Sequence, residues 1–402
     1  MSHAHNPYTA VSRSLPILRG WAIVWIVMYH LLGNTKGYVV LPEILPSLFQ
    51  GNLKLILESS LQLLISAGDT GVSIFLVISG FGLTASWWKQ YGCQGIKSIA
   101  LVKFWSKRVF KIFPLFWAAV VISTALYLIN SDWAPFGQGI WEQKTLTILG
   151  AFLATITTVR NVIPDYYYFL NGAWWYIGLA LQLYLIFPVL IRLGQRWGWS
   201  NLLMASFLLS GVYRAVFALA PLDDMWTVMT FDLFPARLFE FTFGIYIAIT
   251  FLGSSDNLVQ NYSTSNSTGE RWLRSLLFKP QFLGLNLCCF LVGLLFKWSD
   301  YEILSIFEDA LISVGLFCTL IFCAQFKGLT LGPLIKTAGK YSYGIYLTHM
   351  NIYLVLWPMA SKLVPSYWPR FVIVMLACCA IGASFETGYG WLQKQLQNPK
   401  VA

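Results

Sequence analysis

A continuous apolar run from Leu15 to Leu32 is the feature that most constrains how this chain can fold. About 20 helical residues cross the roughly 30 Å hydrocarbon core of a bilayer, so a run of this length predicts a membrane-spanning helix. The composition agrees, because 57% of the residues are hydrophobic and only 11% are charged, against about 25% charged in an ordinary soluble domain. The apolar runs are continuous rather than alternating, which favours helices over a transmembrane barrel.

Nine further apolar runs predict an all-α membrane protein, a bundle of about ten transmembrane helices. They lie at about Gly71 to Trp88, Ile112 to Ile129, Trp174 to Leu193, Leu202 to Leu219, Pro235 to Leu252, Phe282 to Phe296, Ile303 to Phe326, Tyr341 to Met359 and Phe371 to Leu392. A shorter piece, Leu146 to Val159, predicts a half-buried helix. We expect one transmembrane domain over residues 1–402, with a polar N-terminal tail over 1–14 and a mobile cytoplasmic loop over 253–279.

Lysine and arginine concentrate in alternate loops, after the second, fourth, sixth and eighth predicted spans. The positive-inside tendency therefore predicts that both termini are cytoplasmic in a multi-pass protein of the cell membrane. The net charge of +10 is better explained by basic cytoplasmic loops that contact lipid phosphates or an anionic substrate than by nucleic acid, which we do not expect as a partner. The sequence carries no signal for the oligomeric state.

Two ionisable residues, Arg19 and His30, interrupt the first run. They are eleven positions apart, about three helical turns, so both project from nearly the same face, roughly 16 Å apart along the axis. Such residues are costly inside a bilayer unless they face a polar cavity, and they are functional candidates by default. We expect this face to line a reaction chamber in which a neutral imidazole acts as general base. The alternative is a hydrogen-bonded histidine that packs between helices.

Arg108 and Lys111 lie three residues apart just before the third span, with Lys107 beside them. Residues at this spacing share a helix face. One interpretation is that they anchor the helix at the cytoplasmic interface. The sharper interpretation is a cradle for the phosphates of a ligand such as coenzyme A, because guanidinium and ammonium groups both bind phosphate.

Four other polar residues in predicted spans have two interpretations each. Arg237 and Glu240, three residues apart, form either a structural ion pair or a catalytic one. Ser79 lies among small residues that more often permit close helix contact than act as nucleophiles. His349 is a packing or a functional residue. The seven cysteines lack metal-ligand spacing, so we expect no metal.

Five stretches, in order along nearly the whole chain, together resemble acyltransferase family 3 of the membrane O-acyltransferases. The first resembles that family's L-R-G run ending in His, the second its G-V-x-x-F-F-x-x-S-G-F and the third its R-R-x-x-R-I-x-P. The fourth resembles W-x-L…Q-x-Y…P, and the fifth S-Y-x-x-Y-L-x-H. These stretches are Leu18 to His30, Gly71 to Phe81, Lys107 to Pro114, Trp175 to Pro188 and Tyr341 to His349.

The resemblance implies transfer of an acyl group, expected to be acetyl, from a cytoplasmic acyl-CoA to a hydroxyl of a carbohydrate or related cell-envelope molecule. It assigns the family's essential histidine role to His30 and its partnered arginine role to Arg19. Arg108 and Lys111 match its R-x-x-R pair, with Lys107 near the same phosphates. No attached hydrolase-like domain is recognised, which implies the stand-alone form.

Two departures from the family pattern bear on function. The second arginine of the pair is Lys111 here, which keeps the charge but loses the bidentate fork. Many members carry Glu where this chain has Ala180, so any acid role there is absent or has moved, for example to Glu240. The rival class is a transporter or flippase of a polar lipid or small solute, which also places ionisable residues in spans. Consumption of a thioester separates the two classes.

Overall fold

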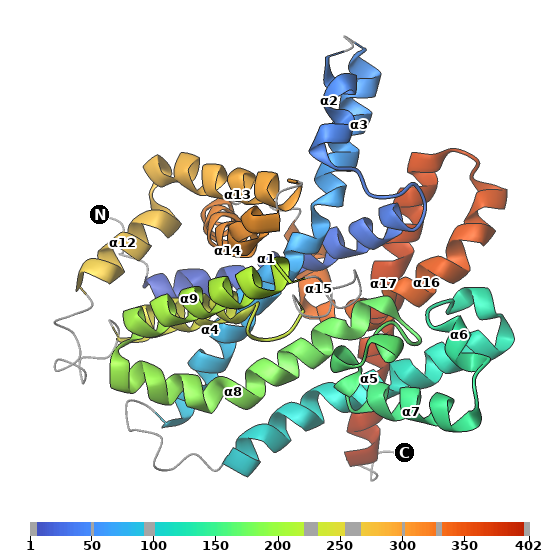
Figure 1. Ribbon diagram of the computed structural model, residues 1–402, viewed down its shortest axis with the longest axis horizontal. Coiled ribbons are helices and arrows are strands. Elements are labelled where there is room, and N and C mark those ends of the chain that lie inside the picture. The colour runs from blue at the N-terminus through green and yellow to red at the C-terminus, as the bar shows by residue number, and fades with distance from the viewer. Residues whose placement is uncertain are drawn as a thin grey trace. The chain divides into compact units, whose positions relative to one another are not determined.

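The described part of the chain is built from helices and turns, without a strand (Figure 1). The computed structural model describes residues 6–49, 52–91, 101–220, 232–253, 267–299, 302–326 and 332–397. Its helices are α1 (Pro7–Gly33), α2 (Leu41–Leu48), α3 (Leu53–Ser66), α4 (Gly71–Tyr91), α5 (Leu101–Ile129), α6 (Gln138–Trp141), α7 (Thr145–Ile156), α8 (Trp175–Trp197), α9 (Trp199–Ala218), α11 (Leu238–Gly253), α12 (Ser267–Phe278), α13 (Leu283–Lys297), α14 (Glu302–Cys323), α15 (Gly332–Lys340), α16 (Ser342–Leu363) and α17 (Tyr367–Gln397). The predicted all-α membrane fold is thereby confirmed.

A helix lies at each of the ten predicted spans. Within the described residues, eight helices are long and apolar enough to cross a membrane. The two predicted spans outside that set are α11, which is a shorter apolar helix, and α16. The short helix α7 stands where a half-buried piece was predicted.

Two predicted boundaries differ in the structure. Helix α1 begins at Pro7, inside the expected polar tail, because the Asn6 side chain accepts a hydrogen bond from the Tyr8 backbone N–H and proline suits the first helical position. The expected loop over 253–279 contains α12, whereas residues 254–266 of that loop lie outside the described residues, as do residues 1–5.

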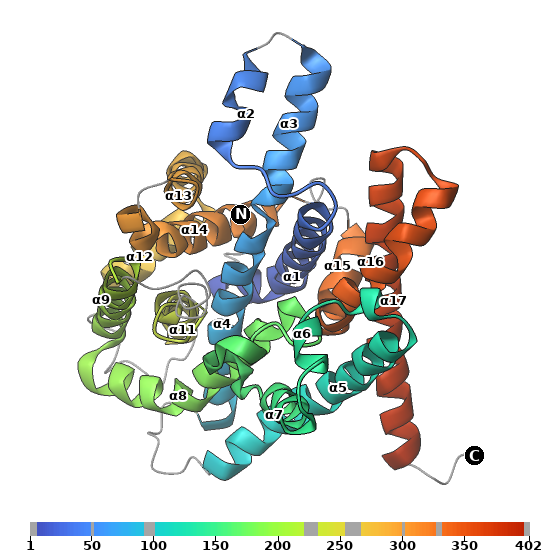
Figure 2. The same cartoon turned by 45° about the vertical axis from the view of Figure 1, so that its right-hand side comes forward.

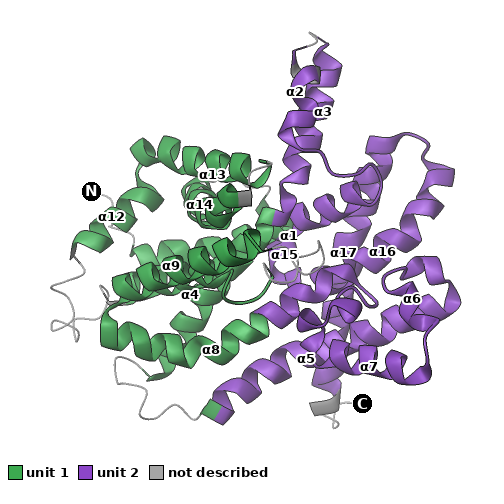
Figure 3. Cartoon of the chain, viewed as in Figure 1, with its two compact units in different colours: residues 1–22, 70–101, 180–335 green, residues 23–69, 102–179, 336–402 purple. Residues whose placement is uncertain are grey.

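The chain divides into two compact units (Figure 3). Unit 1 consists of residues 1–22, 70–101 and 180–335, and unit 2 consists of residues 23–69, 102–179 and 336–402. Helix α1 contributes its first part to unit 1 and its last part to unit 2.

Glycines bring the helices of unit 1 into backbone contact. A Cβ on Gly80 of α4 would lie 2.0 Å from the carbonyl oxygen of Phe241 in α11, and one on Gly244 would lie 2.0 Å from that of Val77. Helices α13 and α14, side by side in Figures 1 and 2, meet at Gly315, where a Cβ would lie 2.4 Å from a backbone nitrogen. Small residues permit this close packing in the absence of a hydrophobic driving force between helices.

In unit 2, a buried arginine shapes the connection between α7 and α8. The Arg160 guanidinium donates hydrogen bonds of 2.7 Å to the carbonyl oxygens of Phe169 and Asn171. The same connection holds α16: Trp174 Nε1 donates to the Leu347 carbonyl at 3.0 Å, and the amide of Asn171 donates to Asn351 Oδ1 at 3.0 Å. These contacts fix the middle of α16, where His349 lies.

Candidate active site

His30 lies in the last turn of α1, half-buried, and its ring meets that of His349 in α16. The two ring centroids are 5.2 Å apart and the rings are tilted by 38°. The ring of Tyr29 approaches His30 edge-on, with a centroid distance of 5.1 Å. Two histidines that the sequence presented as separate candidates are therefore neighbours in unit 2.

The backbone around His349 determines which ring nitrogen carries the proton. Nδ1 lies 2.8 Å from the carbonyl oxygen of Tyr346 and 3.2 Å from that of Ile345. A carbonyl oxygen can only accept, so Nδ1 is the donor and the neutral ring presents a lone pair at Nε2. That Nε2 is buried and has no hydrogen-bond partner among the described residues.

Arg19 is half-buried on α1. Because α1 is one helix from Pro7 to Gly33, Arg19 and His30 keep the predicted separation of about three turns. The next residue, Gly20, packs against backbone: a Cβ there would lie 1.9 Å from the carbonyl oxygen of Ile335 in α15. The glycine of the L-R-G stretch is thus required by close packing beside the arginine.

The part of α5 from Lys107 to Lys111, called its basic end below, carries three cationic side chains that differ in solvent exposure. Lys107 and Lys111 are exposed, whereas Arg108 is half-buried and its guanidinium carbon lies 5.3 Å from the centre of the Phe104 ring. Arg108 Nε is buried without a hydrogen-bond partner in the described part of the chain. A half-buried guanidinium with an unpaired N–H suits an anionic ligand.

A hydrogen bond connects this basic end to the start of α16. The hydroxyl of Tyr343 donates to the carbonyl oxygen of Ile112 at 2.8 Å. Glu386 of α17 accepts a hydrogen bond of 2.8 Å from the backbone N–H of Gly344 and lies within electrostatic range of Lys111. The carboxylate of Glu386 therefore offsets part of the positive charge of Lys107, Arg108 and Lys111, and the net charge of the basic end stays positive.

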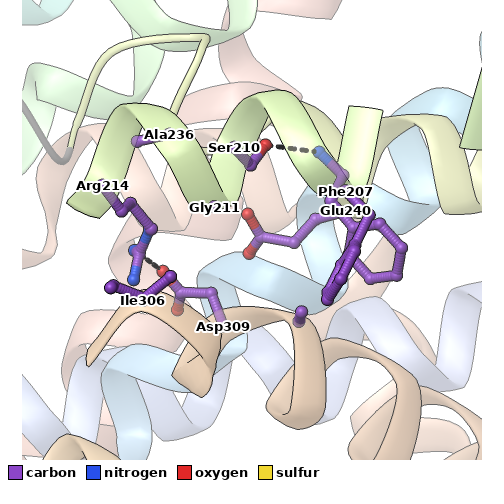
Figure 4. A pocket seen from close by; sticks show the side chains of 10 residues that line it. Phe207, Ser210, Gly211, Arg214, Ala236, Glu240, Ile306 and Asp309 are labelled. Atoms are coloured by element: carbon purple, nitrogen blue, oxygen red, sulfur yellow. Dashed lines mark hydrogen bonds and ion pairs between the residues drawn. The ribbon is translucent and has the colours of Figure 1, made fainter. Parts of the chain in front are cut away.

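The predicted pair of Arg237 and Glu240 is present in unit 1 as part of a larger buried cluster. Figure 4 shows three charged members of this cluster, Arg214, Glu240 and Asp309. Arg237 Nη1 lies 3.2 Å from Glu240 Oε1 and 2.5 Å from Asp309 Oδ2. Ser73 donates to Glu240 Oε1 at 2.7 Å, and Arg214 pairs with Asp309. Arg214 and Asp309 were not predicted as members of this site, although charged residues inside apolar helices such as α9 and α14 are themselves a signal.

The cavity at this cluster is small. Its volume is about 10 Å³, which is room for about one water molecule. Its lining combines Phe207 and Phe239 with the charged side chains of Arg214, Glu240 and Asp309. This space does not admit a thioester, so the geometry favours the structural interpretation of the Arg237–Glu240 pair.

The remaining candidates lie in the helices where they were expected. Ser79 is half-buried in α4, next to the Gly80 contact with α11, which fits close packing. Ala180 of α8 is buried. Within the described residues, no group of three or more His, Cys, Asp and Glu side chains could hold a metal ion.

Comparison with known proteins identifies the family. The sequence model of the acyltransferase domain family matches residues 13–386. Two proteins of Staphylococcus aureus, from strains COL and MRSA252, are named as candidate O-acetyltransferases and are each 28% identical over 137 residues. The match covers 32% of this chain and 20% of each relative, so the chain spans about a fifth of the length of these curated relatives. No solved structure shows significant similarity to the chain.

The family match covers the helices that carry Arg19, His30, the basic end of α5 and His349. The chain therefore belongs to acyltransferase family 3, and its described residues include eight helices long and apolar enough to cross a membrane.

Proposed function

We propose that this O-acyltransferase moves an acetyl group from acetyl-CoA to a hydroxyl of a carbohydrate or related cell-envelope acceptor, with His30 as the general base. The names of the S. aureus relatives support acetyl as the group transferred. The observation that carries the proposal is the half-buried imidazole of His30 at the end of α1, beside a second buried imidazole. Two neutral imidazoles together, within a membrane helix bundle, suit proton transfer better than packing.

The chemistry proceeds by direct attack. His30 takes the proton of the acceptor hydroxyl, and the hydroxyl oxygen attacks the thioester carbonyl. The carbon–sulfur bond then breaks, and the departing thiolate takes the proton back from His30, so protons balance over one turnover. Arg19, three turns away on the same helix, lies too far from His30 to contact the developing oxyanion, and it orients a distant part of the donor.

We place the phosphates of the donor at Lys107, Arg108 and Lys111, with this end of α5 facing the cytoplasm. The spare buried donor of Arg108 supports this placement. Helix α16 connects the proposed phosphate site to the neighbour of the proposed base. Tyr343 of this helix is hydrogen-bonded to Ile112, the residue after Lys111. His349 lies six residues after Tyr343, which is about 9 Å along the helix axis.

The test uses the purified protein in lipid with labelled acetyl-CoA and an extract of cell-envelope carbohydrate. The proposal predicts release of free CoA only when acceptor is present, and loss of that release in His30→Gln. A transporter or flippase would leave the thioester intact, and full acyl transfer by His30→Gln would reject the role of the base.

A matched pair of variants on one helix tests Arg19. Arg13 is exposed on α1, so Arg13→Ala removes the same charge away from the proposed site. Arg19→Ala is expected to lower the turnover number strongly, and Arg13→Ala to leave it unchanged. Equal activity of the two variants would exclude a role for Arg19.

A further inference from the structure

His349 Nε2 is a buried acceptor atom with an unusual environment. The residue is 0% exposed, and Nε2 finds no hydrogen-bond partner among the described residues. Buried polar side-chain atoms are usually hydrogen-bonded, and a catalytic role is one explanation for an unpaired one. Two rings with polar atoms neighbour the His349 ring: His30, with a centroid distance of 5.2 Å, and Tyr346, at 6.1 Å. The hydroxyl of Tyr346 is already hydrogen-bonded to the carbonyl oxygen of Ala173.

The orientation of this acceptor is fixed by the fold. Nδ1 lies 2.8 Å from the carbonyl oxygen of Tyr346 and donates its proton to it. The lone pair of the neutral ring is therefore on Nε2. Residues on both sides of His349 are held from the α7–α8 connection: Trp174 donates to the backbone carbonyl of Leu347, and Asn171 donates to the side-chain oxygen of Asn351.

The carboxylate of Asp69 is within electrostatic range of Tyr29 and Tyr38, and it is not among the groups that act on either imidazole. Within the described residues no carboxylate contacts either imidazole, and the neighbours of His349 from α1 and α17 are His30 and Cys378. A general base that takes a proton becomes an imidazolium, and in many hydrolases a carboxylate stabilises and orients it. Here the acceptor in that position is a neutral imidazole.

We infer that His349 is a positioning residue for His30: its Nε2 accepts an N–H hydrogen bond from the imidazolium that forms when His30 takes the acceptor proton. The centroid separation of 5.2 Å is compatible with this bond when the two ring nitrogens face each other. The inference rests on the proposed role of His30 as base. The pairing holds the His30 ring in one orientation and stabilises its charged state in the transition state.

Two substitutions of similar size separate this role from packing. His349→Gln keeps an acceptor oxygen at the end of the side chain, and His349→Met fills the space without a strong acceptor. We expect His349→Met to lower kcat by about 10- to 100-fold, the effect of removing a group that orients a reactive side chain, with the KM for acetyl-CoA unchanged. His349→Gln is expected to restore most of kcat.

The measurement is steady-state acetyl transfer by both variants, with thermal unfolding in the same lipid as the control for folding. Equal activity of His349→Met and the wild type would overturn the inference, and so would equal losses of kcat and melting temperature in both variants. His30→Gln is assayed alongside: if it retains transfer, the proposed base is wrong. If it is inactive while His349→Met is fully active, only the positioning role is wrong.

Discussion

The hydroxyl of Tyr343 donates a hydrogen bond to the carbonyl oxygen of Ile112 and thereby joins the start of α16 to the basic end of α5. This bond connects the proposed phosphate site to the helix that carries His349. Tyr343→Phe removes the bond and leaves the ring, at a cost of about 0.5–1.5 kcal/mol in stability. We expect a small fall in melting temperature and a lower kcat/KM for acetyl-CoA. Unchanged kinetic constants would show that this connection does not matter for the reaction.

The lysine at position 111 predicts weaker donor binding than an arginine would give. Lys111→Arg restores a planar fork that can bind phosphate through two hydrogen bonds. The expected result is a lower KM for acetyl-CoA with kcat unchanged, whereas Lys111→Ala should raise KM. Lys103 is also exposed on α5 but lies outside the proposed cradle, so Lys103→Ala serves as the control. An equal effect of Lys103→Ala would attribute the change to general surface charge.

Arg160 is predicted to be essential for the fold of unit 2. Burial lowers the pKa of Arg160 to about 10, so it stays protonated at neutral pH and keeps donating to Phe169 and Asn171. Arg160→Met leaves those two buried carbonyl groups without donors, at about 1–3 kcal/mol each. Thermal unfolding should show a large loss, against little change for Arg192→Met, since Arg192 is exposed. Similar melting temperatures for the two variants would contradict the assignment.

The buried cluster of unit 1 is predicted to stabilise the bundle. Asp309 contacts both Arg214 and Arg237. Asp309→Ala leaves two buried guanidinium groups short of a partner, at a cost of about 3–5 kcal/mol.

The comparison for this prediction is Glu270→Ala. Glu270 pairs with the partly exposed Arg274 at 2.6 Å, and such pairs contribute about 0–1 kcal/mol. Chemical unfolding of the two variants should therefore differ widely. Equal losses would show that the cluster of unit 1 does not stabilise the bundle.

The helices could be predicted from the sequence because their signals are local, and the same kind of signal selected the candidate site residues. Apolar runs long enough to cross a bilayer as a helix predict the spans. An ionisable residue inside such a run, for example His30, is easily recognised. The start of α1 was missed because a capping Asn6 and Pro7 extend a helix through polar residues, where hydrophobicity carries no signal.

The pairings could not be predicted, because they join residues far apart in the chain. Nothing local to His30 indicates that His349 is its neighbour. The ion pair of Arg237 and Glu240 was visible at a spacing of three residues. Its extension to Asp309 depends on how α11 and α14 pack, which a single sequence does not encode in any local pattern.

The most direct measurement is mass spectrometry of the cell-envelope carbohydrates of cells that make either the wild-type protein or His30→Gln, at equal membrane levels, in a background without this gene. The account predicts acetyl esters on the carbohydrate with the wild type and none with His30→Gln. Acetyl esters in equal amount with both proteins would contradict it.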